Sequence, residues 1–261
     1  MPRFAANLSF LFTEMPFLER FAAARQAGFR FVEYMFPYDE EPHTLATTLQ
    51  AHGLTQVLFN LPAGNWAAGD RGIAIHPERQ EEFRQGVERA RVYARALGVR
   101  RINCLAGIVP PGLAHKDATA TLVANLRYAA DVLGEDGITL LLEPVNDLDI
   151  PGFFIRTGAE ALPIVEAVGV PNLRIQYDVY HAVRMGEDPL AFLREHMSLI
   201  GHVQIADVPG RHQPGTGRAP LRDVLIELDH LGYDGYVGLE YVPVPDTWHA
   251  FDWIEAAGFQ R

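Results

Sequence analysis

Residues 137–147 read GITLLLEPVND, and this stretch decides the fold. The largely apolar run 138–142 is typical of a parallel strand that is covered on both faces. Pro144 has no N–H group to donate to a strand ladder, so we expect the strand to end at Glu143. A carboxylate at the end of a buried strand needs a partner, and the other strand ends are the first place to look for one.

The same pairing of a short apolar run with an amphipathic stretch recurs along the whole chain. The helical patterns 17–28 and 77–98 both end in glycine, the residue that most readily adopts the left-handed cap of a helix. A glycine also precedes the strand in ALGVRRINCLAG, AVGVPNLRIQYD and HLGYDGYVGLEY. The expected strands are 4–8, 31–34, 56–60, 101–105, 139–143, 174–178, 202–206 and 236–241.

Eight strand and helix units in 261 residues predict an α/β protein with a single (β/α)₈ TIM barrel, occupying residues 1–261 as one domain. The alternative is an open, doubly wound parallel sheet. It is disfavoured because no G-x-G-x-x-G motif follows the first strand and no Walker lysine motif is present.

The composition argues against several classes of function. With 22 basic and 33 acidic residues, a net charge of -11 and no basic run, the chain is not expected to bind nucleic acid. No run approaches the ~18 apolar residues of a membrane span. Polar Asn7 and Ser9 interrupt the N-terminal apolar run, which we interpret as a strand and not as a signal peptide. The single cysteine, Cys104, has apolar neighbours, so we expect a buried thiol and a reducing cytoplasm.

The active site of a TIM barrel is built from the carboxyl ends of its strands, so the residues at these ends are considered together. Three apolar strands end in an acid, at Glu143, Asp178 and Glu240, and Gln204 has a comparable position in HVQIA. These four residues are 35, 26 and 36 residues apart, each about one strand and helix unit. Strands five to eight would therefore each direct one oxygen ligand toward a common point.

Three carboxylates in a dry cleft would repel one another, so a positive charge is expected among them. Oxygen ligands favour a hard divalent cation, Mg²⁺ or Mn²⁺, over zinc. Taken singly, each acid could instead cap a helix or pair with an arginine. A divalent ion held in this way could chelate an α-hydroxycarbonyl and acidify the C–H bond between the two oxygens. Glu143 and Glu240 could then exchange the proton, which is isomerase or epimerase chemistry.

The chain resembles the hydroxypyruvate isomerase family, in the xylose-isomerase-like superfamily of TIM barrels, from end to end. The segments that carry the resemblance are RFAANLSFLFTE, VEYMFPY, NLPAGNWAAGDRGIA, YARALGVRRINCLAG, NLRYAAD, LLEPVN, DIPGF, IQYDVYH, HVQIAD, PGTG and GYVGLEY. The resemblance implies a Mg²⁺-type site at Glu143, Asp178, Gln204 and Glu240, with Glu143 and Glu240 transferring the proton. It also implies that the substrate is a small-molecule hydroxy-oxo acid. The reaction would be the interconversion of hydroxypyruvate and 2-hydroxy-3-oxopropanoate, a reaction of glyoxylate metabolism.

The sister family of 2-oxotetronate isomerases is the closest alternative, and would share the metal and the glutamates. The loop NLPAGNWAAGDRG after the third strand looks like the hydroxypyruvate type, which favours the three-carbon substrate. Metal-dependent endonucleases on this scaffold bind zinc through many histidines and bind DNA through basic surfaces, and the chain has neither feature. A sugar-binding module without catalysis would need no paired glutamates. A homo-oligomer is possible, since the sequence leaves the oligomeric state open.

Four further residues are candidate substrate ligands. His181, three residues after Asp178, could donate to a substrate oxygen or orient Asp178. His202 points to the same side of its strand as Gln204 and could line the site. Arg211, on the loop after the seventh strand, could bind a substrate carboxylate as a bidentate fork or could be a solvated loop charge. Arg71, in GDRG, is a second candidate for the carboxylate.

Two other residues near strand ends have structural alternatives. Glu33, at the end of the second strand, could reach the cleft, but a structural hydrogen-bonding role is favoured. Trp66 lies in a glycine-rich loop, where it could act as a hydrophobic lid or simply pack within the loop.

Overall fold

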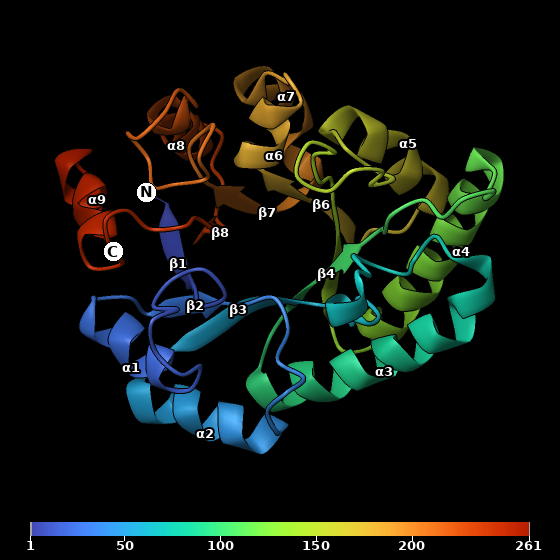
Figure 1. Cartoon of the computed structure of the whole chain (residues 1–261), viewed down its shortest axis with the longest axis horizontal. Helices are drawn as coiled ribbons and strands as arrows, with labels where there is room; N and C mark the ends of the chain where they lie inside the picture. The colour runs from blue at the N-terminus through green and yellow to red at the C-terminus, as the bar shows by residue number, and fades with distance from the viewer. Residues whose placement is uncertain (1, 261) are drawn as a thin grey trace.

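The computed structural model describes residues 2–260, and its centre is a closed barrel of eight parallel strands in the order β1-β2-β3-β4-β5-β6-β7-β8 (Figure 1). The predicted (β/α)₈ TIM barrel is therefore confirmed. The strands are β1 Arg3–Asn7, β2 Phe31–Glu33, β3 Thr55–Asn60, β4 Arg101–Leu105, β5 Thr139–Glu143, β6 Leu173–Asp178, β7 Ile200–Ile205 and β8 Tyr236–Leu239.

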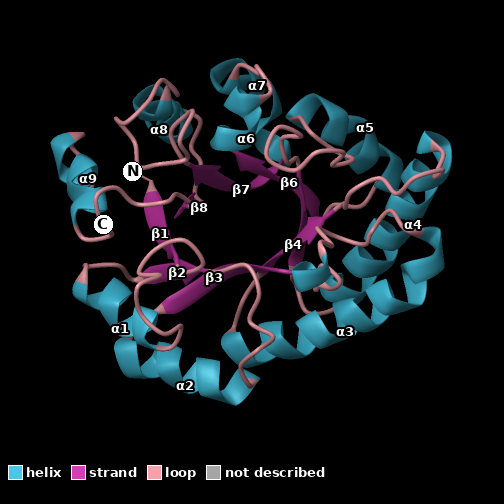
Figure 2. Cartoon of the chain, in the orientation of Figure 1, coloured by secondary structure: helices cyan, strands magenta, loops and turns pink. Residues whose placement is uncertain are grey.

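Helices surround the barrel and cover the outer face of every strand (Figure 2). They are α1 Glu19–Gln26, α2 Pro42–His52, α3 Gln80–Leu97, α4 His115–Gly134, α5 Gly158–Val168, α6 Val179–Arg184, α7 Pro189–His196, α8 Leu221–His230 and α9 Asp252–Ala256. Single 3₁₀ turns occupy Trp66–Ala68, Pro77–Arg79, Met197–Leu199 and His249–Phe251. Among the described residues, no helix combines the length and the apolar character that a bilayer crossing requires.

The predicted strand limits agree with the structure at β4 and β5 and differ by one or two residues elsewhere. The largest differences lie at the end of the chain. β7 begins at Ile200, two residues before its predicted start, because Ile200 pairs with Ile175 of β6. β8 ends at Leu239, two residues before its predicted end, so Glu240 lies just beyond the strand.

The interior of the barrel is apolar in its middle and polar at the carboxyl ends of the strands. A small cluster that contains Ala5, Val57 and Leu141 fills the middle of the barrel, since Ala5 and Leu141 are the central residues of β1 and β5. The carboxyl ends carry buried polar side chains instead: Asn7, Glu33, Asn60, Asn103, Glu143, Gln176, Asp178, His202, Gln204 and Glu240. The main core lies outside this layer, between the strands and the helices.

Cys104 on β4 is buried, as its apolar neighbours predict. Burial raises the pKa of its thiol to about 12, so the sulfur is protonated at neutral pH. A protonated, inaccessible thiol is a poor nucleophile, and Cys104 serves as a small apolar side chain of the core.

Candidate active site

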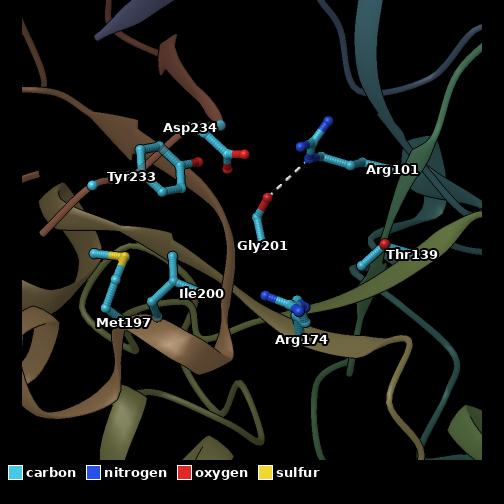
Figure 3. A pocket seen from close by; sticks show the side chains of 10 residues that line it. Arg101, Thr139, Arg174, Met197, Ile200, Gly201, Tyr233 and Asp234 are labelled. Atoms are coloured by element: carbon cyan, nitrogen blue, oxygen red, sulfur yellow. Dashed lines mark hydrogen bonds between the residues drawn. The ribbon is translucent and has the colours of Figure 1, made fainter. Parts of the chain in front are cut away.

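A cavity of about 120 Å³ lies at the carboxyl end of the barrel, where Glu143, Gln176, His181, Arg211 and Glu240 are among the side chains that line it. A larger pocket, of about 350 Å³, lies at the opposite end of the barrel (Figure 3). The smaller cavity is the candidate active site because the acidic side chains meet there, and because TIM barrels place their chemistry at this end.

Two of the predicted acids lie side by side on neighbouring strands. Glu143 is the last residue of β5, and Asp178 is the last residue of β6. Asp178 also caps α6, since its Oδ1 accepts a hydrogen bond of 2.8 Å from the backbone N–H of Tyr180. Glu143, Asp178 and His181 each offer one ligand atom, and these three atoms lie within 4.8 Å of one another. The spacing is suitable for a shared cation.

Glu240 lies opposite, just after β8, and its carboxylate is held by three donors. Its Oε2 accepts from the side-chain amides of Asn7, at 2.9 Å, and Gln204, at 2.5 Å. Its Oε1 accepts from Arg211 at 2.5 Å. These contacts fix the orientation of the carboxylate at the edge of the cavity.

Gln204 points the nitrogen of its amide, and not the oxygen, toward the acids. Its Nε2 donates to Glu33 and Glu240, and its Oε1 accepts from Nε2 of Gln176 at 2.7 Å. The Oε1 atom of Gln176 is buried and has no hydrogen-bond partner within the described part of the chain. Turning both amides over would keep them in contact and would satisfy this oxygen. Gln204 Oε1 would then face the carboxylates, an arrangement that a cation among them would stabilise.

Burial raises the pKa of all three acids. Burial, with a smaller contribution from Asp178, raises the pKa of Glu143 to about 8. Burial raises the pKa of Asp178 to about 6, although the positive charge of Arg211 opposes this rise. The pKa of Glu240 is raised well above its usual value, again mainly by burial. Such pKa values are typical of groups that exchange protons near neutral pH, and they also show how much the cluster needs positive charge.

Arg211 supplies positive charge within the cluster. One of its terminal nitrogens contacts Asp178 at 3.3 Å and Glu240 at 2.5 Å. Its guanidinium carbon lies 4.8 Å from the ring centroid of Phe10 and 4.9 Å from that of Tyr180. Burial alone would lower the pKa of Arg211, but Glu240 and Asp178 outweigh burial and raise it. The backbone of Arg211 has a φ of 56°, so this residue adopts a left-handed conformation that is uncommon for a side chain of its size.

His181 lies against Asp178, with 3.5 Å between its Nε2 and the carboxylate Oδ2. On the other side of the ring, Nδ1 accepts from the backbone N–H of Asn146 at 3.3 Å and lies 2.6 Å from the Asn146 amide nitrogen. Burial, assisted by the charges of Arg211 and Arg184, lowers the pKa of His181 well below 6.5. The imidazole is therefore neutral, and because Nδ1 accepts, its proton is on Nε2, which faces Asp178 and the cavity.

His202 and Glu33 lie beneath the cavity. His202 Nε2 is 2.7 Å from Glu33 Oε2, and Glu33 Oε1 accepts from Asn7 at 3.0 Å and from Gln204 at 2.8 Å. Both side chains are essentially inaccessible to solvent. Glu33 thus makes the structural hydrogen bonds that were favoured for it from the sequence. His202 is not among the cavity-lining residues, so it can reach substrate only through Glu33 and Gln204.

Arg71 also lies outside the cavity, whereas Trp66 lines it. The Arg71 guanidinium stacks 4.0 Å from the Trp66 ring centroid and donates to the backbone oxygens of Trp66 and Asp70. The Trp66 ring packs against Phe36 with 5.1 Å between centroids. Arg71 therefore positions Trp66, which covers the cavity from the loop after β3.

Gln176 and Asn103 are among the side chains of the site that were not predicted from the sequence. Gln176 lines the cavity two residues before Asp178, and Asn103 on β4 donates to Glu143 at 2.6 Å. The period of two along a strand places Gln176 on the same face as Asp178, so the pattern RIQYD contained this signal. Asn103 could have been found by the same reasoning on the segment NCLAG.

Comparison with known proteins agrees with the geometry. The model of the xylose isomerase-like TIM barrel family matches residues 21–257. The hydroxypyruvate isomerase of Escherichia coli (strain K12) is 48% identical over 255 residues, which cover 98% of this chain and 99% of that protein. The 2-oxo-tetronate isomerase of Cupriavidus necator is 42% identical over 255 residues and 98% of each chain.

A crystal structure from Brucella melitensis, described as an AP endonuclease of family 2, has a TM-score of 0.96 to this chain. It is 45% identical in sequence, and the match covers 98% of this chain and 99% of that one. The full-length match to isomerases is the more informative result, because two relatives with assigned reactions share it. This chain belongs to the xylose isomerase-like TIM barrel family, in the group that contains these hydroxypyruvate and 2-oxo-tetronate isomerases, and is an isomerase.

Proposed function

We propose that the protein interconverts hydroxypyruvate and 2-hydroxy-3-oxopropanoate, with a divalent metal and with proton transfer by Glu143 and Glu240. One observation carries the proposal: two buried glutamates with raised pKa values line a small cavity that also contains an arginine. The relative from Escherichia coli, 48% identical along the whole chain, supports the choice of substrate.

The donors at the cavity suit a hard divalent ion. Glu143, Asp178 and Glu240 supply three carboxylates, and Gln204 supplies an amide oxygen once its side chain is turned over. Oxygen donors of this kind favour Mg²⁺ or Mn²⁺. A divalent ion bound there would polarise the carbonyl and hydroxyl oxygens of the substrate and make the C–H bond beside them more acidic.

The two glutamates then move the proton. One glutamate removes a proton from C3 of hydroxypyruvate, which leaves an enediolate, and the other delivers a proton to C2. The hydroxyl proton passes from O3 to O2, so the product has the same atoms and charge as the substrate. Without metal, burial raises the pKa of Glu143 to about 8, so its carboxylate takes up a proton more readily than an ordinary glutamate does.

Arg211 and His181 would orient the substrate. The Arg211 fork can bind the substrate carboxylate, since its five N–H donors match the geometry of a planar carboxylate. The Nε2 proton of neutral His181 can be donated to a substrate oxygen. Trp66, at the mouth of the cavity, would exclude water from the enediolate.

A four-carbon substrate is the second candidate, because a 2-oxo-tetronate isomerase is 42% identical to this chain. The cavity of about 120 Å³ favours the smaller acid. A nuclease activity is disfavoured, since residues 2–260 contain one group of three or more possible metal ligands, with a single histidine, on a chain of net charge -11.

The proposal predicts a preference in kcat/KM. With Mg²⁺ or Mn²⁺ present, kcat/KM for hydroxypyruvate should exceed that for 2-oxotetronate by at least ~10-fold, because the extra carbon must fit into a cavity of only about 120 Å³. Both constants should be measured on the same preparation of enzyme. A higher value for the four-carbon acid would reverse the assignment and keep the mechanism, whereas no turnover of either acid would remove both.

Proton transfer also predicts exchange with solvent. When the reaction is run in D₂O, deuterium should appear on carbon in the product, because a proton held on a glutamate can exchange before it is returned. Product analysis by NMR or mass spectrometry measures the fraction. Complete retention of the original hydrogen over a range of temperature and pH would favour a hydride shift instead.

A further inference from the structure

The amino end of the barrel carries a second, chemically different pocket. It has a volume of about 350 Å³ and lies at the starts of β4 to β8, where Arg101, Thr139, Arg174, Gly201 and Asp234 line it (Figure 3). We propose that this pocket is a binding site for a small oxyanion, such as phosphate or a carboxylate, which the Arg101 and Arg174 guanidinium groups would hold.

Neither arginine of this pocket pairs with a carboxylate of the described residues. Several arginines elsewhere in the chain pair with a carboxylate, as Arg91 does with Glu135 at 2.6 Å and Arg194 with Glu227 at 2.9 Å. Within residues 2–260, no carboxylate oxygen lies within 4.0 Å of the Arg101 or the Arg174 guanidinium. The charges of these two guanidinium groups, which line one pocket, are therefore available to an anion.

Both guanidinium groups donate a hydrogen bond to a backbone oxygen. Arg101 Nε donates to the backbone oxygen of Gly201 at 2.9 Å, and the Arg101 guanidinium lies 5.2 Å from the ring centroid of Tyr236. Arg174 donates to the backbone oxygen of Ser198 at 3.1 Å. Each arginine therefore keeps other N–H donors for a ligand, and binding would require little further ordering of the side chains.

Gly201 allows this arrangement. A Cβ atom at this position would lie 2.5 Å from Leu141 Cδ2 and 3.0 Å from Arg174 Cβ. A larger residue would therefore displace Arg174. In Figure 3, Arg101 lies above Gly201 and Arg174 lies below it, and the dashed line is the hydrogen bond from Arg101 to the Gly201 oxygen. Both guanidinium groups line the pocket that an anion would occupy.

Asp234 sets the charge of the pocket. It is exposed on the loop before β8 and is the acidic residue that lines the pocket. With two arginines and one aspartate, the lining side chains carry a net charge of about +1 at neutral pH. This charge suits a small oxyanion, which two guanidinium groups can bind with parallel N–H to oxygen hydrogen bonds, and is too weak for a large polyanion.

The pocket is separate from the active site. The cluster of Ala5, Val57 and Leu141 fills the barrel between the two ends, so an anion at Arg101 does not touch the catalytic acids. Phosphate at this pocket should therefore leave substrate binding unchanged, whereas phosphate at Arg211 would compete with substrate. The kinetic pattern distinguishes the two locations, and it does so whatever reaction the enzyme catalyses.

Calorimetric titration of the whole protein with inorganic phosphate tests the proposal, with sulfate and acetate as further probes of charge and shape. Arg101→Gln and Arg174→Gln should each weaken phosphate binding by ~10-fold or more, since each removes a charged donor. Arg25→Gln, at an exposed arginine of α1, is the matched control and should bind phosphate as the wild type does.

Asp234→Asn gives a test that misfolding cannot imitate. Removing the opposing charge should tighten phosphate binding several-fold. Equal phosphate affinities in the wild type, Arg101→Gln and Asp234→Asn would overturn the proposal. It would also be overturned if phosphate bound only in competition with substrate.

Discussion

Replacing Glu143 or Glu240 with glutamine is expected to lower kcat by roughly 10² to 10⁴ while the fold persists. Glutamine has nearly the same shape and still offers an oxygen to a metal, but its amide cannot take up a proton. The hydrogen bonds from Asn103 to Glu143 and from Asn7 to Glu240 can both be accepted by the amide oxygen. Steady-state kinetics and circular dichroism of the variants measure the two parts of the prediction.

Glu227→Gln is a matched control, because it makes the same chemical change on α8, in a surface pair with Arg194 of α7. It should leave kcat within about twofold of the wild type, as surface pairs contribute little. Near-normal turnover in Glu143→Gln or in Glu240→Gln would mean that the base has been assigned to the wrong residue.

Removal of divalent metal is expected to abolish turnover and to lower the thermal stability. At a free metal concentration of ~100 times Kd, binding to the folded state contributes about 2.7 kcal/mol, which corresponds to a rise in Tm of roughly 5 to 10 °C for a chain of this size. Calorimetry of chelator-treated protein with added Mg²⁺, Mn²⁺ or Ca²⁺ measures the rise. Asp178→Asn, which removes one carboxylate from the cluster, should show a smaller rise.

The variant Arg211→Met provides a second test of the metal site. Without metal, Arg211 is the positive group that contacts Asp178 and Glu240. Its loss should therefore destabilise the metal-free protein more than the metal-bound protein. With metal bound, the carboxylates have another partner, and the metal-dependent rise in Tm should therefore be larger in the variant than in the wild type. An unchanged Tm with every divalent ion, in the wild type and in the variant, would contradict the metal site itself.

The alternation of apolar runs and helical patterns was sufficient to predict the barrel, because parallel strands covered on both faces leave little choice of architecture. The spacing of Glu143, Asp178, Gln204 and Glu240 was informative for a related reason. Parallel strands all present their carboxyl ends at the same edge, so residues one strand and helix unit apart along the chain meet in space. The strand limits were less certain, since pairing between neighbours, and not local sequence, decides where a ladder begins and ends.

The tertiary structure alone decided the roles of the remaining polar residues. His202 and Gln204 point to the same side of β7, and the sequence does not reveal that Glu33, from the other side of the barrel, binds His202 and keeps it beneath the cavity. Arg71 and Arg211 both follow strands in glycine-containing loops, yet one stacks on Trp66 and the other enters the acid cluster. Periodicity fixes the face on which a side chain lies, whereas its partner depends on which distant segment the fold brings opposite it.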